Sequence, residues 1–233
     1  MYFLDPTYLC FMAPGLLLVM LASWYVKSAY SKWSRVPVRS GMTGAQAAQR
    51  LIMSGGLNGV QVQAIGGNLT DNYDPRDKVL RLSQGVANTA SVASVAVAAH
   101  ELGHAMQDAE GYFPLRFRAA LVPAVNIGSW LGWILIFAGI LLNMTNLAWV
   151  GILVFSAGAI FALATLPVEL NASARAKRLL ADTGIVAGPD ERRGVNKVLN
   201  AAALTYVAAL ATAVLQLLYF VSLVGGMGGR RRG

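Results

Sequence analysis

Two histidines lie four residues apart in this chain, and a glutamate directly follows the first of them. His100 and His104 are the only histidines among the 233 residues. On an α-helix, residues four apart share one face, so both imidazoles can bind the same ion. Glu101 is offset from His100 by about 100° around the helix, which places its carboxylate beside the ion. This H-E-x-x-H arrangement is typical of zinc sites that hydrolyse peptide bonds.

The chemistry that such a site supports needs both the metal and the glutamate. Zinc lowers the pKa of a bound water to about 7. Glu101 is therefore predicted to act as the general base that takes a proton from this water, and a polarised carbonyl such as a peptide bond is the natural substrate. The plain alternative is a pair of ordinary buried histidines on an apolar helix.

A catalytic zinc usually has three protein ligands and one open position, so the helix of His100 and His104 lacks one ligand. Asp108 continues the same stripe, but three successive turns of one helix cannot surround an ion, so Asp108 is expected to support a ligand instead. Glu169 ends a 50-residue stretch without charge and is predicted as the third ligand. An acid in the first turn of a helix also suits the helix dipole, and this second explanation of Glu169 stays open.

The remaining acidic residues are less suitable as the third zinc ligand, because they are expected elsewhere in the structure. Asp5 is expected across the membrane, and Glu110 at the end of the histidine helix. Three acids have the setting of a turn: Asp71, Asp74 and Asp77. Three more are expected in exposed surroundings: Asp182, Asp190 and Glu191.

The composition is that of a membrane protein, with 56% hydrophobic residues, 13% charged residues and a mean hydropathy of +0.53. The charge-free segment 119–168 would measure about 75 Å as one helix, which exceeds the thickness of a bilayer. It is therefore predicted to fold into a hairpin that turns near Asn143–Asn146. Two further charge-free segments complete a set of four expected transmembrane helices, at about 9–26, 121–142, 147–167 and 201–224.

Charge placement predicts the orientation. Segments 27–118 and 169–200 carry 10 and 6 of the 19 lysines and arginines. Four spans put both segments on one side, and the positive-inside rule makes it the cytoplasmic side of the membrane. Arg230–Arg232 lie on the opposite side in this topology and argue against it. Because juxtamembrane placement explains the basic excess, no nucleic-acid partner is expected.

Shorter elements are predicted between the spans. Residues 27–39 read as a basic connector along the lipid headgroups. Thr43 is the predicted N-cap of a helix that ends at Gly55. Val60–Ile65 and Val79–Leu82 alternate as strands of a small sheet or hairpin. This sheet could be a packing platform, or an edge that pairs with an extended peptide.

The helix of the two histidines is predicted from about Asn88 or Thr89 to Asp108, and its small apolar first half should be buried. Residues 169–182 are expected to be helical, with Glu169 opening the helix, and 183–193 to form a loop.

The fold class is thus a mainly α integral membrane protein with a small β element. About four transmembrane helices surround a zincin-like H-E-x-x-H helix. Five segments follow in order. They are an N-terminal membrane anchor (1–26), a cytoplasmic catalytic region (27–118), a transmembrane hairpin (119–168), a third-ligand helix with a loop (169–200), and a C-terminal membrane helix with a basic tail (201–233).

Several motifs, in order along nearly the whole chain, resemble the bacterial membrane-bound neutral zinc metallopeptidases of the YugP-like family. They are Leu69–Arg76, Val79–Ser83, Ala98–Gln107, Pro167–Glu169 and Ala203–Ala209. The resemblance implies a gluzincin site, in which His100, His104 and Glu169 bind one catalytic Zn²⁺ and Glu101 is the base. The chain has Asn171 where the family pattern has an acid, which concerns the hydrogen bonds around the ligands and not the ligand set.

The expected function is a membrane-embedded zinc endopeptidase that cleaves peptides or membrane-protein segments near the cytoplasmic surface. Tyr206 is a candidate donor to the oxyanion, with Tyr112 and Arg175 as alternatives. Either tyrosine could instead be an interfacial aromatic, and Arg175 could form a salt bridge with Glu169 or another acid.

Two other functions remain as alternatives. A non-enzymatic membrane scaffold with a structural zinc site would have no use for Glu101. A transporter is less favoured, because no predicted span contains a charged residue that would mark a pathway. The sequence specifies neither the oligomeric state nor any protein partner.

Overall fold

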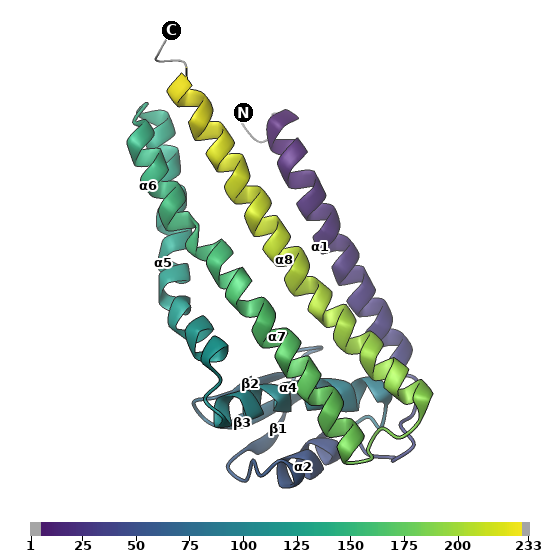
Figure 1. The fold of residues 1–233 in the computed structure, drawn as a ribbon. Helices are drawn as coiled ribbons and strands as arrows, with labels where there is room; N and C mark the ends of the chain where they lie inside the picture. Colours follow the sequence, from purple (N-terminus) through teal and green to yellow (C-terminus); the bar gives the residue numbers. More distant parts are fainter. Residues whose placement is uncertain (1–5, 230–233) are drawn as a thin grey trace. The chain divides into compact units, whose positions relative to one another are not determined.

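The computed structural model describes residues 6–229, which form eight helices and one three-stranded sheet (Figure 1). These residues divide into two compact units. The membrane unit comprises 6–21, 116–167 and 205–229, and the site unit comprises 22–115 and 168–204. Asp5 and Arg230–Arg232, which entered the topology prediction, lie outside the described residues.

Four stretches of helix are long and apolar enough to cross a membrane, in agreement with the predicted number. They are Pro6–Trp33, Phe113–Leu141, Thr145–Asp182 and Pro189–Met227. The first is α1, the second α5 and the fourth most of α8 (Pro189–Gly229), whereas the third contains α6 (Thr145–Phe155) and α7 (Ala157–Asp182). Large apolar side chains stay exposed on them, such as Trp130 at 70% and Leu153 at 73%, a surface that lipid would cover.

The predicted turn between the second and third spans is confirmed within the membrane unit. Helix α5 ends at Leu141 and α6 begins at Thr145. Asn143 between them has a φ of 55°, a conformation that asparagine tolerates better than most residues. Close packing holds the hairpin together, because a Cβ atom at Gly139 would lie 2.5 Å from the nitrogen of Ala148.

The first span continues further than predicted. Residues 27–33 belong to α1 and are not part of a connector between helices. Neither proline nor glycine occurs from residue 27 up to Pro37, and Tyr30 and Trp33 pack against the core of the site unit. Burial of these aromatic side chains stabilises the extra helical turns.

The small sheet lies in the site unit, with strand order β1-β3-β2. The predicted strands are confirmed as β1 (Gln61–Ile65) and β3 (Val79–Ser83), which pair in parallel. The edge strand β2 (Asn72–Asp74) was not predicted, because three polar residues carry no alternating pattern. The turn after it is confirmed, since the carboxylate of Asp74 accepts a hydrogen bond from the backbone nitrogen of Arg76 at 3.0 Å.

Helix caps set the starts of two helices in the site unit. Thr43 caps α2 (Gly44–Ser54) as predicted, in a reciprocal pair of hydrogen bonds with Gln46. The histidine helix α4 (Val92–Ala109) begins later than predicted. A separate short helix α3 (Gln84–Ala87) precedes it, and the hydroxyl of Ser91 accepts a hydrogen bond from the nitrogen of Ser94 at 3.1 Å.

Helix α4 is the centre of the core of the site unit. Its first half is buried as predicted, and its neighbours in the core come from α2, β3, α7 and α8. Gly103 lies directly against α7: a Cβ atom there would meet the carbonyl oxygen of Ala172 at 2.4 Å. The two helices therefore touch backbone to backbone between His100 and His104.

Three predictions about α7 and α8 are wrong. Helix α7 runs unbroken from Ala157, so Glu169 lies in its interior and not in a first turn, which removes the helix-dipole explanation. The loop predicted to reach residue 193 ends at 188, because Pro189 takes the first position of α8, where its missing N–H costs nothing. Glu191 is buried rather than exposed, and it accepts hydrogen bonds from the backbone nitrogens of Arg39, Ala187 and Gly188.

The close contact at Gly103 predicts that a larger residue there destabilises the protein. Gly103→Ala should lower the melting temperature of the purified protein, because the new methyl group must displace the backbone of Ala172, and such overpacking costs about 1–3 kcal/mol. The gain of about 1 kcal/mol in helix propensity does not offset this. In Gly225→Ala, the matched control, the added Cβ meets nothing within 4 Å. Equal melting temperatures of the two variants would contradict the prediction.

Candidate metal and catalytic site

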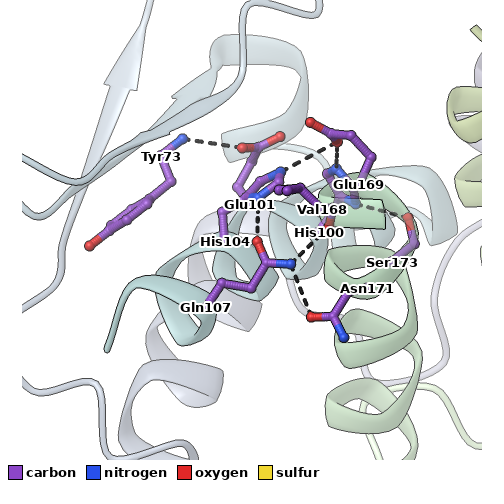
Figure 2. Close-up of polar contacts among 9 residues, drawn as sticks. All are labelled: Tyr73, His100, Glu101, His104, Gln107, Val168, Glu169, Asn171 and Ser173. Carbon is purple, nitrogen blue, oxygen red and sulfur yellow. Dashed lines mark hydrogen bonds and ion pairs between the residues drawn. The ribbon is translucent and has the colours of Figure 1, made fainter. Parts of the chain in front are cut away.

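Helices α4 and α7 bring His100, His104 and Glu169 together (Figure 2). The Oε2 atom of Glu169 lies 3.2 Å from Nε2 of His100 and 3.5 Å from Nε2 of His104. Between residues 6 and 229, this is the one group of three or more metal-binding side chains whose ligand atoms all lie within 4.8 Å of one another. The side chains are 12%, 13% and 3% exposed, respectively.

The proton of His104 is placed by the neighbouring amide of Gln107. Gln107 Nε2 donates to the carbonyl oxygen of Val168 at 2.8 Å and to Oδ1 of Asn171 at 3.0 Å. Its Oε1 atom, 3.0 Å from Nδ1 of His104, is therefore the acceptor of that contact. Nδ1 carries the proton, and Nε2 of His104 faces Glu169.

The orientation of the His100 imidazole is fixed in the same way, by a hydrogen bond from its Nδ1 atom to a different residue. Its Nδ1 atom lies 3.1 Å from the hydroxyl oxygen of Ser173, four residues beyond Glu169 on α7. A hydroxyl can accept the Nδ1 proton, which leaves Nε2 of His100 directed at Glu169. Both imidazoles thus present the same nitrogen to the carboxylate, as paired zinc ligands do when their other nitrogen is engaged.

This arrangement gathers electron-rich atoms in a place that is shielded from water. Two imidazole nitrogens and a carboxylate oxygen at such distances need a positive charge between them, either a proton or a metal ion. Burial alone would lower the pKa of His104, but Glu169 and Glu101 raise it above its ordinary value. Tetrahedral zinc ligands at about 2.0–2.1 Å from the ion lie about 3.3–3.4 Å apart, so the spacings to Glu169 fit zinc.

Glu101 lies beside this group and has a different environment (Figure 2). Its Oε2 atom accepts a hydrogen bond from the backbone nitrogen of Tyr73 at 3.1 Å. Burial raises the pKa of the Glu101 carboxyl, which increases its affinity for a proton. One oxygen is thus fixed by strand β2, and the carboxylate is suited to proton transfer.

Asp108 was expected to support a metal ligand, and its contacts are with the sheet instead. Its carboxylate accepts a hydrogen bond from the hydroxyl of Tyr73 at 2.8 Å and pairs with Lys78. Burial and this contact raise the pKa of the Tyr73 hydroxyl. Asp108 therefore fixes the strand whose backbone holds Glu101.

Arg175 forms the salt bridge that was one of its two predicted roles, and its partner is Glu110. Its two terminal nitrogens donate to the Glu110 carboxylate at 2.6 and 2.7 Å, while Nε donates to Oδ1 of Asn171 at 2.7 Å. The pKa of Glu110 is lowered by the hydrogen bond from Arg175. Tyr112 stacks against the same guanidinium at 5.8 Å. Asn171 thus accepts from both Gln107 and Arg175 through one amide oxygen.

The sequence reasoning did not identify three of these residues: Gln107, Ser173 and the backbone of Tyr73. Gln107 and Ser173 follow a predicted ligand by three and four residues, which places each on the ligand's own helix face and could have been noticed. No sequence signal points to Tyr73, because its role belongs to the main chain. Tyr206 lies in the membrane unit and remains a prediction.

The hydrogen bonds of Gln107 predict its effect on metal affinity. Gln107→Ala removes the acceptor for His104 and should weaken zinc binding about 10- to 100-fold. Competition with a fluorescent chelator would measure this. Asp108→Asn, on the next residue of the same helix but without a contact to either histidine, should keep the affinity of the parent protein. Unchanged affinity in Gln107→Ala would show that the amide does not orient His104.

Comparisons with known proteins show the family of the chain. The family described as "Putative neutral zinc metallopeptidase" matches residues 8–225. A relative from Bacillus subtilis (strain 168), "Putative membrane protease YugP", is 46% identical over 200 residues, which cover 86% of this chain and 88% of that protein. No solved structure matches. The resemblance stated from the motifs is confirmed, and the chain belongs to this family of zinc metallopeptidases.

Proposed function

We propose that the protein is a membrane-embedded endopeptidase that hydrolyses peptide bonds with one zinc ion and a glutamate base. The observation that carries this proposal is the convergence of His100 and His104 on Glu169, with Glu101 beside them. A gluzincin ligand set of these three residues leaves a fourth position for water or substrate. A purely structural site would need no buried carboxylate next to its ligands.

In the proposed mechanism, Glu101 moves a proton. A zinc ion held by the three ligands supplies Lewis-acid polarisation of the substrate carbonyl and acidifies water. Glu101 accepts the proton of the attacking water on the oxygen that Tyr73 does not hold, and it delivers this proton to the nitrogen of the leaving amine. The raised pKa of Glu101 suits both halves of this transfer. Ser173 and Gln107 keep the two imidazoles oriented throughout.

The donor to the developing oxyanion is a separate part of the proposal. Arg175 is less suitable than the sequence suggested, because Glu110 and Asn171 occupy all three of its nitrogens. Tyr206 remains the candidate, with Tyr112 as the alternative.

The proposed substrates are peptides or membrane-protein segments at the cytoplasmic face of a bacterial inner membrane. The basic segments 27–118 and 169–200 support this orientation through the positive-inside rule. Both segments contribute to the site unit, which holds the candidate ligands.

Replacement of Glu101, the proposed base, is the sharpest test of the proposed peptidase mechanism. Glu101→Gln should lower the cleavage rate of an unfolded protein substrate by about 100-fold or more, since general-base catalysis contributes at least that factor. Its zinc content should stay that of the parent protein, because Glu101 is not a ligand. Asp77→Asn, at an exposed site in the turn, is the control and should keep full activity. Retained activity in Glu101→Gln would exclude Glu101 as the base, whereas a parent protein that binds zinc but cleaves nothing would favour a scaffold with structural zinc.

Removal of a ligand should have a different signature. His100→Ala and Glu169→Gln should each lose bound zinc, measured by elemental analysis, and lose activity with it. A strong chelator should inactivate the parent protein, and added zinc should restore it. Full zinc content in Glu169→Gln would exclude Glu169 as a ligand, and activity that survives the chelator would exclude a zinc peptidase.

A further inference from the structure

One face of α8 carries a stripe of polar and basic residues that the proposed catalysis does not use. The stripe consists of Arg192, Arg193, Asn196, Lys197 and Asn200, all exposed. The opposite face of the same turns is buried in the core of the site unit, through Val195, Val198 and Leu199. These basic residues are therefore held on a fixed helical surface.

An open groove of about 490 Å³ runs along this stripe, with Tyr25 of α1 as part of its wall. The two helices meet closely below it, because a Cβ atom at Gly194 would lie 2.5 Å from the ring of Trp33. The groove is thus a rigid feature between α1 and α8, and its residues all belong to the site unit.

The charge of the groove is positive and largely unpaired. Arg193 contacts Asp190 at 3.5 Å, and both side chains are well exposed. Among residues 6–229, no carboxylate forms an ion pair with Arg192 or Lys197. Lys177 of α7 donates to Oδ1 of Asn200 at 2.9 Å and adds a further positive charge at the end of the groove. Such a surface fits a phosphate group, which guanidinium and ammonium groups bind well.

The groove also lies where both helices change from polar to apolar. On α1 the charge-free segment ends at residue 26, and Trp24, which precedes the groove residue Tyr25 in the chain, is 68% exposed. On α8 the exposed face becomes apolar at Leu204, one turn beyond Asn200. The exposed Trp24 and the half-buried Tyr25 at this border mark the level of the lipid headgroups, where such aromatic residues are enriched.

We propose that this groove binds the phosphate of an anionic phospholipid headgroup, with Arg192 and Lys197 as its main contacts. Basic pockets between transmembrane helices on the cytoplasmic side bind such headgroups in other membrane proteins. The same chemistry would accept a free phosphate monoester, but a ligand whose acyl chains cover the apolar surface beside Trp24 and Leu204 matches the position of the groove better.

Native mass spectrometry of the full-length protein in detergent, with added phosphatidylglycerol, tests the proposal. The parent protein should bind phosphatidylglycerol more tightly than phosphatidylcholine, which has no net charge. The double variant Arg192→Gln/Lys197→Gln should bind it about 25-fold more weakly, since each cation near the membrane surface contributes about a factor of five. Arg192→Lys alone, which keeps the charge, should retain most of the affinity.

The matched control is Lys27→Gln/Arg35→Gln, which removes the same charge from two exposed positions outside the groove, one on α1 and one just after its end. It should bind phosphatidylglycerol like the parent protein. Equal weakening in both double variants would indicate general attraction to basic charge and overturn the site. Tight binding of soluble glycerol phosphate, or displacement of the lipid by it, would overturn the lipid as occupant. All variants should keep the zinc content of the parent protein, which confirms that they are folded.

Discussion

The contact between the backbones of α4 and α7 at Gly103 is the constraint on which the site depends. A side chain at this position would separate the helices, and the carboxylate of Glu169 would then move away from the two imidazoles. The glycine sits between His100 and His104 on the face that α7 covers. Close approach by a residue without a Cβ is therefore what turns two ligands on one helix and a third on another into a single cluster.

Burial makes the orientation of these ligands important. In a setting shielded from water, an imidazole with the wrong nitrogen toward the carboxylate would leave a donor or acceptor unmatched, at a cost of about 1–3 kcal/mol. Gln107 and Ser173 avoid this cost on opposite sides of the cluster. The amide of Gln107 also bonds to α7 at Val168 and Asn171, so the same residue orients a ligand and fixes the helix of the third ligand. Arg175 and Glu110 extend this set of hydrogen bonds to the surface.

The basic residues of the chain serve more than one purpose in this structure. Some are paired, as Arg175 is with Glu110 and Arg81 with Asp74. Others, on α8, face an open groove at the level where the helices become apolar. The sequence rule that uses their number to predict the cytoplasmic side treats them all alike. Their individual surroundings distinguish structural pairs from a surface that can receive an anionic headgroup.

The sequence by itself determined the features that depend on local pattern. Charge-free length specified four apolar spans, spacing placed His100 and His104 on one helix face with Glu101 beside them, and the residue types around Thr43 specified a helix cap. The third ligand could be named from its position after the charge-free stretch, but the reason was incomplete, because the sequence placed Glu169 at the start of a helix. Only the tertiary structure decided that α7 continues through Pro167 and that its backbone packs directly against Gly103. It also decided that Gln107, Ser173 and the backbone of Tyr73 orient the side chains of the site. The contacts of Gly103, Gln107 and His100 with α7 join segments more than 60 residues apart, and the role of Tyr73 belongs to a main-chain group common to nearly all residues. The only local sign was the helical spacing of Gln107 and Ser173 from a ligand, which does not by itself indicate a contact.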